Sequence, residues 1–196
     1  MNARAFGRLA LAAAAWLAAC ATPPPRPPAP EDVLAARRAA LASLRQWRAE
    51  GRLALQAAEG SGGLSFHWRQ DGARFDLQLV APFGNGRWRV HGDGRRLVWD
   101  LDGERLDGEA GRLWLRERLG WDGPVERLGE WLLAAPRDGR VQRADRFGRP
   151  LEIAGAGWRA HYSRYLEVGR RSLPGRVEVE GEGWRIKIAV RRWTVY

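Results

Sequence analysis

Cysteine and lysine are almost absent from this 196-residue sequence, and each scarcity excludes a class of protein. Cys20 is the only cysteine, which excludes a disulfide-stapled scaffold and any Cys-x-x-Cys metal or redox motif. Lys187 is the only lysine among 33 basic residues, and the arginines are scattered without a dense run although the net charge is +10. We therefore interpret the basic residues as a solvated surface and predict no nucleic-acid partner.

The sequence also has little that resembles a membrane span. The apolar run Leu9–Ala19 has the length of a signal-peptide core and is too short to cross a bilayer well. It ends in Leu17-Ala18-Ala19-Cys20, which resembles a bacterial lipobox. That resemblance implies a lipoprotein signal peptide over residues 1–19, cleavage before Cys20 and acylation of this cysteine. The other interpretation is an ordinary signal peptide whose apolar core ends in cysteine.

The residues after Cys20 indicate a target membrane and a spacer. Under the enterobacterial sorting rule, Ala21 in place of aspartate implies export to the outer membrane. Thr22–Pro30 is almost all proline, which is typical of a polyproline II segment that extends by about 3.1 Å per residue. We predict a lipidated tether over residues 20–30 and a single domain over residues 31–196 that faces the periplasm.

Hydrophobic periodicity in the remaining chain is typical of strands with helical interruptions. Glu31–Trp47 carries apolar residues at three- and four-residue spacing and is predicted to be a helix. From Gly51 to Leu101 apolar and polar residues alternate between glycine turns, which predicts an antiparallel meander. Glu109–Leu119 and a segment from Pro124 to Ala135 are predicted helices. Further strands are expected at Val141, Leu151–Ile153, Trp158–Tyr162, Arg176–Glu180 and Trp184–Val190.

Catalytic and metal-binding motifs are lacking as well. His67, His91 and His161 lie far apart in the sequence, without the spacing of a metal site. No serine lies in Gly-x-Ser-x-Gly, and the spacing of the carboxylates selects no catalytic pair. We therefore predict that the protein is not an enzyme and uses no cofactor or metal.

Tryptophan, by contrast, is abundant, with 11 residues that often lie on the alternating apolar face. Most are expected in the core, but flat aromatic side chains inside a curved sheet also suit a cavity for a long apolar ligand. Three Gly-x-Gly segments, beginning at Gly84, Gly155 and Gly181, are followed by Trp and Arg. We interpret them as hairpin turns, because none has the spacing of a dinucleotide-binding loop.

An ordered set of short motifs resembles the LolB family of outer-membrane lipoproteins. The resemblance covers Gln46–Trp193, and its motifs are Trp47 before Gly51–Leu55, Phe66–Gln70, Leu77–Gly84, Leu128–Leu132 before Pro136, Gly157-Trp158, Leu173-Pro174, Ile186–Ile188 and Trp193. It implies a mainly β fold with helices, an incomplete antiparallel β-barrel around a hydrophobic cavity that short helices cover. It also implies a non-catalytic acceptor that takes acylated lipoproteins from the periplasmic carrier LolA and inserts them into the outer membrane. We expect a monomer.

The same resemblance assigns site residues. Trp68, Trp131, Trp158 and Trp193 are predicted to line the acyl-chain cavity, and the alternative for each is a packed core residue without ligand contact. Pro82-Phe83-Gly84 is predicted to be the membrane-insertion loop, in which Phe83 replaces the more common leucine. The alternative buries Phe83 in the core.

Two other functions remain open from the sequence. One is a non-catalytic outer-membrane lipoprotein that scaffolds an envelope assembly, with the tryptophans as ordinary core. The other is the soluble carrier itself, which would share the barrel, although a lipid anchor at Cys20 argues against a protein that must diffuse.

Overall fold

The computed structural model describes residues 30–57, 60–82, 86–93, 95–121 and 123–196. Cys20, Phe83 and Gly84 lie outside the described residues, so their predicted roles stay predictions. The elements are α1 (Pro30–Ala42), β1 (Gln46–Ala57), β2 (Gly60–Asp71), β3 (Arg74–Val80), β4 (Arg87–Gly92), β5 (Leu97–Leu101), β6 (Glu104–Asp107), α2 (Gly108–Leu119), the 3-10 turn η2 (Val125–Arg127), α3 (Leu128–Leu133), β7 (Arg140–Ala144), β8 (Pro150–Gly155), β9 (Trp158–Val168), β10 (Arg171–Gly181) and β11 (Trp184–Val195).

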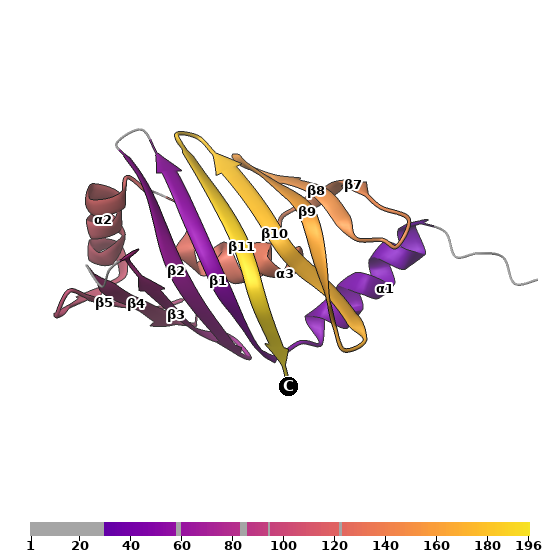
Figure 1. The fold of residues 1–196 in the computed structure, drawn as a ribbon, viewed down its shortest axis with the longest axis horizontal. Helices are drawn as coiled ribbons and strands as arrows, with labels where there is room; N and C mark the ends of the chain where they lie inside the picture. Colours follow the sequence, from indigo (N-terminus) through magenta and orange to yellow (C-terminus); the bar gives the residue numbers. More distant parts are fainter. Residues whose placement is uncertain (1–29, 58–59, 83–85, 94, 122) are drawn as a thin grey trace, which may run out of the picture.

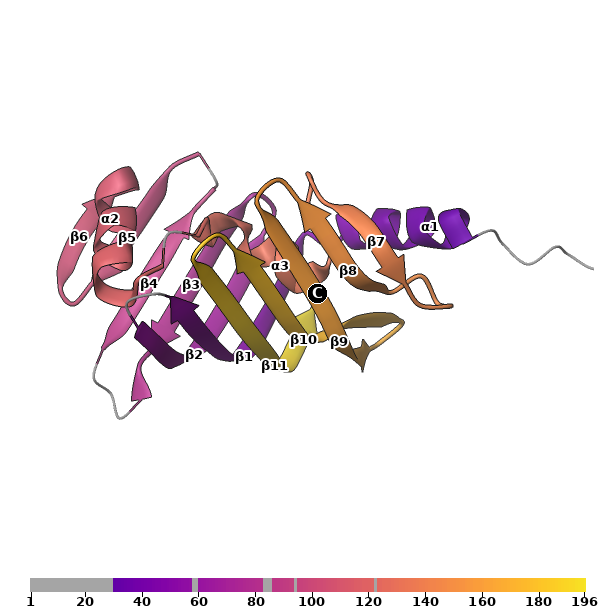
Figure 2. The ribbon, with the colours of Figure 1, turned by 90° about the horizontal axis from the view of Figure 1, so that it is seen from above.

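All eleven described strands form one antiparallel sheet, in the order β6-β5-β4-β3-β2-β1-β11-β10-β9-β8-β7. The first and last strands pair with each other in its middle (Figure 1). The sheet curls around α3 but does not close, because β6 and β7 do not pair with each other in the described chain (Figure 2). The predicted fold class, an incomplete antiparallel barrel with short helices, is confirmed.

The alternation that predicted the strands corresponds to a sheet with one buried face. In β1 every second residue from Trp47 to Leu55 is buried, and the residues between them are exposed or half-buried. The predicted helix over Glu31–Trp47 is too long, because α1 ends at Ala42 and β1 begins at Gln46. Leu44 and Trp47 continue the three-residue apolar spacing of α1, but they belong to a turn and a strand.

A bulge in the central strand pair requires a glycine. The register between β1 and β11 shifts between Glu50 and Gly51. A Cβ atom at Gly51 would lie 2.0 Å from the carbonyl oxygen of Ala189, so no larger residue fits there without displacing the backbone. The glycine of the Gly51–Leu55 motif therefore sets how closely the two central strands approach.

Two helices cover the concave face of the sheet. Helix α3 lies behind the central strands in Figure 1 and contacts β10, and its Leu128, Trp131 and Leu132 are fully buried. Helix α2 packs on β5 and β6 at one end of the sheet, and α1 lies at the opposite end. Helices, and not further strands, therefore close the opening of the barrel.

Tryptophan rings rest on glycines throughout this interior. A Cβ atom at Gly111 of α2 would lie 2.2 Å from the ring of Trp99, and one at Gly129 of α3 would lie 2.6 Å from the ring of Trp68. The two Gly-x-Gly turns that precede Trp158 and Trp184 repeat the arrangement within a hairpin, since Gly155 faces Trp158 across the strands. For these two segments the interpretation as hairpin turns is confirmed, and the glycines leave room for bulky rings. The segment that begins at Gly84 lies partly outside the described residues.

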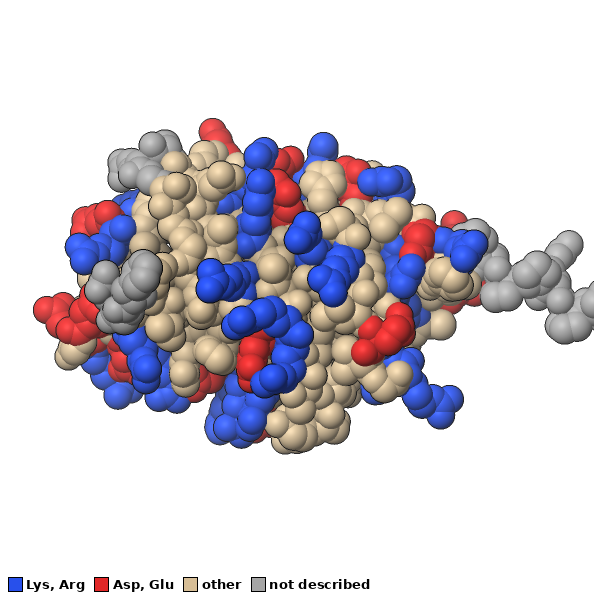
Figure 3. Space-filling view, viewed as in Figure 1, with Lys and Arg blue, Asp and Glu red and all other residues tan. Residues whose placement is uncertain are grey.

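The outer face of the sheet carries charges of both signs. Figure 3 shows Lys and Arg spread over this face with Asp and Glu among them. Glu178 on β10, for example, lies 3.4 Å from Arg185 and 3.8 Å from Lys187 on β11. This dispersed pattern agrees with a solvated surface.

Candidate functional site

A connected group of aromatic rings from β1, β2, β3 and β11 fills one part of the interior. Trp47 stacks on Trp68 at 6.1 Å between ring centroids and lies 5.3 Å from Trp193. Trp68 stacks in turn on Phe75 at 4.7 Å. These residues come from both ends of the chain, and the pairing of β1 with β2 and β11 brings them together. The sequence resemblance indicated Trp68 and Trp193 but missed Trp47 and Phe75 as their partners.

A second aromatic group surrounds α3. Trp131 lies 5.7 Å from Trp158 and 5.9 Å from Trp184, measured between ring centroids. Trp158 and Trp184 follow the two hairpin turns at the same end of the sheet, so two strands present similar rings to one helix. Trp184 is half-buried, and its repeated Gly-x-Gly-Trp-Arg motif was the available signal for it.

The interior that these rings fill is apolar. The side chain of Tyr162 is buried, and burial raises the pKa of its hydroxyl well above the ordinary value. Among the described residues, neither that hydroxyl nor the indole N–H of Trp131 or Trp158 has a hydrogen-bond partner. An interior of this kind solvates hydrocarbon and disfavours charge.

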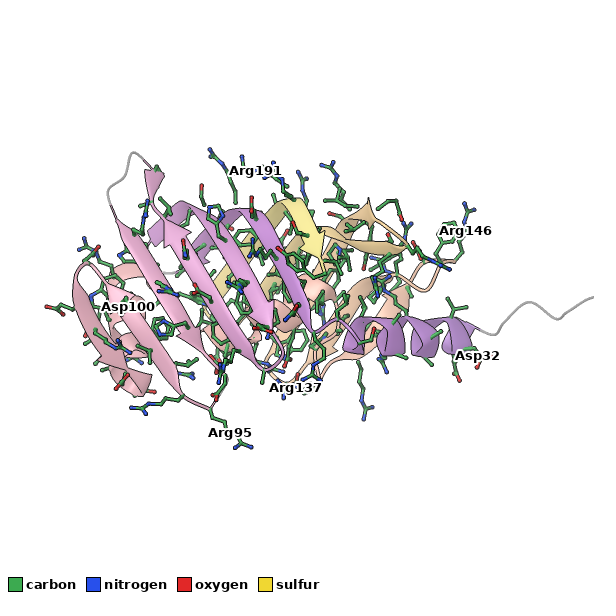
Figure 4. The ribbon with its side chains drawn as sticks, turned by 90° about the horizontal axis from the view of Figure 1, so that it is seen from below. Asp32, Arg95, Asp100, Arg137, Arg146 and Arg191 are labelled. Carbon is green, nitrogen blue, oxygen red and sulfur yellow. The ribbon has the colours of Figure 1, made fainter. Side chains whose placement is uncertain are left out.

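An open cleft of about 530 Å³, here called the mouth cleft, leads to the first aromatic group. Its apolar wall contains Trp47, Phe75, Leu41 near the end of α1 and Leu133 at the end of α3. Its rim is polar and includes Arg137, which is labelled in Figure 4. The volume lies within the range of about 300–1,000 Å³ that is usual for ligand pockets.

Several ion pairs lie near the rim, on the segment that carries α3. Glu130 of α3 accepts a 2.7 Å hydrogen bond from Nε of Arg137, and Arg127 pairs with Asp138. Arg112 of α2 donates a 2.9 Å hydrogen bond to Glu126 of η2. These pairs are partly exposed, and such pairs contribute little stability, so apolar packing holds α3 on the sheet.

The four predicted cavity residues belong to the two aromatic groups described above. All four are buried, with Trp68 and Trp193 in the first aromatic group and Trp131 and Trp158 in the second. Trp158 also borders a shallow cleft of about 720 Å³ at the beginning of β9 and β11. Their predicted contact with acyl chains stays a prediction.

The predicted insertion loop connects β3 and β4. The backbone N–H of Ala81 donates a 3.0 Å hydrogen bond to the carbonyl oxygen of Gly86, which brings the ends of the loop together. Pro82, the only described residue of the predicted Pro82-Phe83-Gly84 loop, is exposed. The loop thus leaves the sheet at a site where its first residue already faces solvent.

The described residues contain neither a metal-ligand cluster nor a helix that could span a membrane. No group of three or more His, Cys, Asp or Glu residues lies close enough together to hold a metal ion in this part of the chain. Within the same residues, no helix is both long and apolar enough to cross a membrane.

A family model described as outer membrane lipoprotein LolB matches residues 45–193. The chain belongs to the LolB family. Among LolB relatives, the outer-membrane lipoprotein LolB of Azoarcus sp. is 34% identical over 196 residues, which cover 97% of this chain and 95% of that protein. The LolB of Halorhodospira halophila is 32% identical over 157 residues, which cover 78% and 77%.

Solved structures similar to this member of the LolB family support the fold. A LolA superfamily protein from Nitrosomonas europaea aligns with a TM-score of 0.55 over 87% of this chain and 94% of its own, at 11% identity. A putative outer membrane lipoprotein-sorting protein domain from Vibrio parahaemolyticus aligns with a TM-score of 0.54 over 85% and 93%, at 10% identity. These similarities concern the fold alone.

A substitution in the mouth cleft of this LolB-family chain tests whether ligands bind there. Leu133→Asp places a charge on its apolar wall, and we expect the affinity for an apolar fluorophore to fall at least about tenfold, or 1.4 kcal/mol. Titration of the fluorophore, followed by quenching of tryptophan emission, measures the change. Leu113→Asp on the exposed surface of α2 is the matched control. Equal affinities for the two variants would show that the ligand does not enter through the mouth cleft.

Proposed function

We propose that this protein is an outer-membrane-anchored acceptor that takes acylated lipoproteins from the carrier LolA and inserts them into the outer membrane. The observation that carries the proposal is an open antiparallel sheet whose concave face is aromatic and is closed by helices. Membership of the LolB family and the likeness to a LolA superfamily structure support it. The proposal includes binding and transfer and no chemical step.

The mouth cleft suits the entry of an acyl chain. Its wall of leucine, tryptophan and phenylalanine offers hydrocarbon contacts, while its polar rim stays in water. Behind this wall, Trp68 stacks on Trp47 and on Phe75, so displacement of α3 would extend the apolar surface without exposing a charged group. We propose that Trp68, Trp131, Trp158 and Trp193 line the enlarged cavity when cargo is bound.

Hydrophobic transfer free energy sets the direction of transfer. The transfer of an acyl chain of about fifteen methylenes from an apolar site into water costs on the order of 12 kcal/mol, so its exposure to water would stall the handover. A direct handover between two cavity mouths keeps that surface dry. Because no ATP is available in the periplasm, the acceptor must bind more tightly than the carrier and less favourably than the bilayer.

Capture of cargo by the Cys20→Ala chain tests the proposal. The purified chain is incubated with LolA that carries an acylated lipoprotein, and the location of the lipoprotein is then measured. Transfer to the chain is expected, and a non-acylated form of the same lipoprotein is the control. A chain that binds neither the lipoprotein nor an apolar fluorophore would contradict the acceptor and favour the scaffold.

Cys20 is proposed as the membrane anchor, with residues 1–19 as signal peptide, 20–30 as lipidated tether and 31–196 as a single domain. Cys20→Ala is therefore expected to release the protein into the periplasm, because several acyl chains at about 0.8 kcal/mol per methylene hold it on the membrane. Fractionation after a high-salt wash measures the effect. Retention of the variant in the outer-membrane fraction would show that another part of the chain is the anchor.

A further inference from the structure

The end of the domain at which α1 begins carries an exposed aromatic side chain among arginines. Phe147, in the turn between β7 and β8, is 57% exposed, and only Leu113 and Tyr196 are comparable among the described apolar residues. Arg146 and Arg149 flank it, and Arg170 and Arg171 lie on the neighbouring β9–β10 hairpin. We call Arg146, Phe147, Arg149, Arg170 and Arg171 the basic tip.

Two of the four arginines of the tip stack on aromatic rings. The guanidinium carbons of Arg146 and Arg149 lie 4.7 Å and 5.1 Å from the centroid of Phe147. Arg149 also lies 5.2 Å from the centroid of Tyr165, and Arg37 of α1 lies 5.3 Å from the same ring. Arginine cations and aromatic rings thus alternate from the surface to α1. Because these contacts already hold Phe147 in its exposed position, its side chain loses little entropy on binding.

The turn itself is also fixed by hydrogen bonds. The Oδ1 atom of Asp145 accepts bonds from the backbone N–H groups of Phe147 and Arg149, at 2.9 Å and 3.0 Å. Tyr165 donates a 2.6 Å hydrogen bond from its hydroxyl to the carbonyl oxygen of Pro150. The exposed phenylalanine therefore lies on a structured turn supported by three strands.

Most of the positive charge at the tip is not neutralised. Arg149 pairs with Asp145 at 2.7 Å and lies 3.9 Å from Glu167. Within the described part of the chain, Arg146, Arg170 and Arg171 form no ion pair with an acidic residue. A groove of about 470 Å³ beside the tip leaves room for anionic groups between these arginines and α1.

The basic tip adjoins the start of the described chain. Gly148 lies so close to Val33 in the first turn of α1 that a Cβ atom on the glycine would be 2.5 Å from Cγ1 of the valine. In Figure 4, Arg146 lies at the end of the molecule where the chain enters α1, and Asp32 points away from it. Cys20 precedes Pro30 by ten positions, so an extended tether reaches roughly 30 Å.

We propose that the basic tip docks on the surface of an anionic phospholipid bilayer, with Phe147 among the headgroups and the arginines on lipid phosphates. Guanidinium groups match phosphate oxygens, and an exposed ring between them adds interfacial contact. A protruding ring can insert among lipid headgroups, whereas docking on a protein would require a complementary pocket for the ring. Docking would add a second attachment beside the anchor and hold the domain in one orientation.

A fluorescent label at the tip tests this proposal in the full-length protein. Acylation leaves the mature chain without a free thiol, so Phe147→Cys introduces a single site for an environment-sensitive fluorophore. The labelled lipoprotein is reconstituted in vesicles of phosphatidylcholine with or without phosphatidylglycerol. We expect a blue shift and quenching by spin-labelled lipid only with phosphatidylglycerol. Each of Arg146→Gln, Arg170→Gln and Arg171→Gln should lower the docked-to-undocked ratio about fivefold.

The control is the same label at Tyr196→Cys, an exposed aromatic residue at the C-terminus, which Figure 1 shows away from the start of α1, and no response to vesicles is expected there. Equal responses of the two labels would overturn the proposal. A blue shift and quenching of the tip label that are the same with and without phosphatidylglycerol would also overturn it. A response to LolA without vesicles, and none to lipid, would identify a protein-docking surface instead. Since no cargo is present, these outcomes do not depend on the proposed transfer function.

Discussion

Phe83→Glu is expected to block delivery of lipoproteins to the bilayer while the chain still folds and accepts cargo. The loop begins at the exposed Pro82, and the backbone N–H of Ala81 donates a hydrogen bond to the carbonyl oxygen of Gly86. In the predicted insertion role, an acidic side chain at position 83 must enter the apolar layer that receives the acyl chains. On membrane-insertion scales this costs about 2.5–3.5 kcal/mol, so delivery should slow about 100-fold.

Two measurements on this variant, with Phe83→Leu as the matched control, separate the alternatives. Transfer of a labelled lipoprotein from the carrier to liposomes should fail for Phe83→Glu and proceed for Phe83→Leu, because the role requires an apolar tip and no aromatic ring. Thermal unfolding of both should resemble that of the parent. A large loss of stability would place Phe83 in the core, and normal delivery by a stable Phe83→Glu variant would exclude the loop from insertion.

Trp131→Ala should have the largest effect on stability of any single substitution considered for this domain. Its ring is fully buried and lies between Trp158 and Trp184, where it joins α3 to two strands of the sheet. Truncation of a buried aromatic residue costs about 3–5 kcal/mol, through lost transfer free energy and the cavity that remains. Because apolar packing holds α3 on the sheet, the helix should loosen first.

Denaturant unfolding measures this loss, with Leu113→Ala as a control on the exposed surface of α2. The control should change the free energy of unfolding by about 0.5 kcal/mol or less. A loss below about 1 kcal/mol for Trp131→Ala would show that α3 is not part of the cooperative core. Hydrogen exchange would then show whether α3 opens independently of the sheet, as the proposed displacement of α3 requires.

The strands could be predicted from the sequence because one face of the sheet is buried and the other is not. In β3, for example, Phe75, Leu77 and Leu79 are buried and the residues between them are not. The error at the end of α1 has a physical cause as well. Leu41, Leu44 and Trp47 all line the mouth cleft, so they are apolar for a shared reason although they belong to a helix, a turn and a strand.

The candidate site could be predicted from the sequence less well than the strands, because it depends on contacts between segments that lie far apart in the chain. Nothing near Trp68 in the sequence indicates that its group includes Trp193, which joins through Trp47 on the central strand. The mouth cleft likewise requires α1, the β2–β3 turn and α3 to meet. The basic tip is distributed over two hairpins, and neither hairpin carries a dense run of arginine in the sequence.

The pairing of the first and last strands at the centre of the sheet also bears on when this chain can fold. Strand β1 has β2 on one side, but its other neighbour is β11, which a ribosome makes last. A sheet with such long-range pairing folds slowly, and its halves cannot join through β1 before the end of the chain is available. A polypeptide exported with its N-terminus first would therefore stay unfolded while it threads a translocation channel, and would complete its central strand pair only after its last residues have crossed.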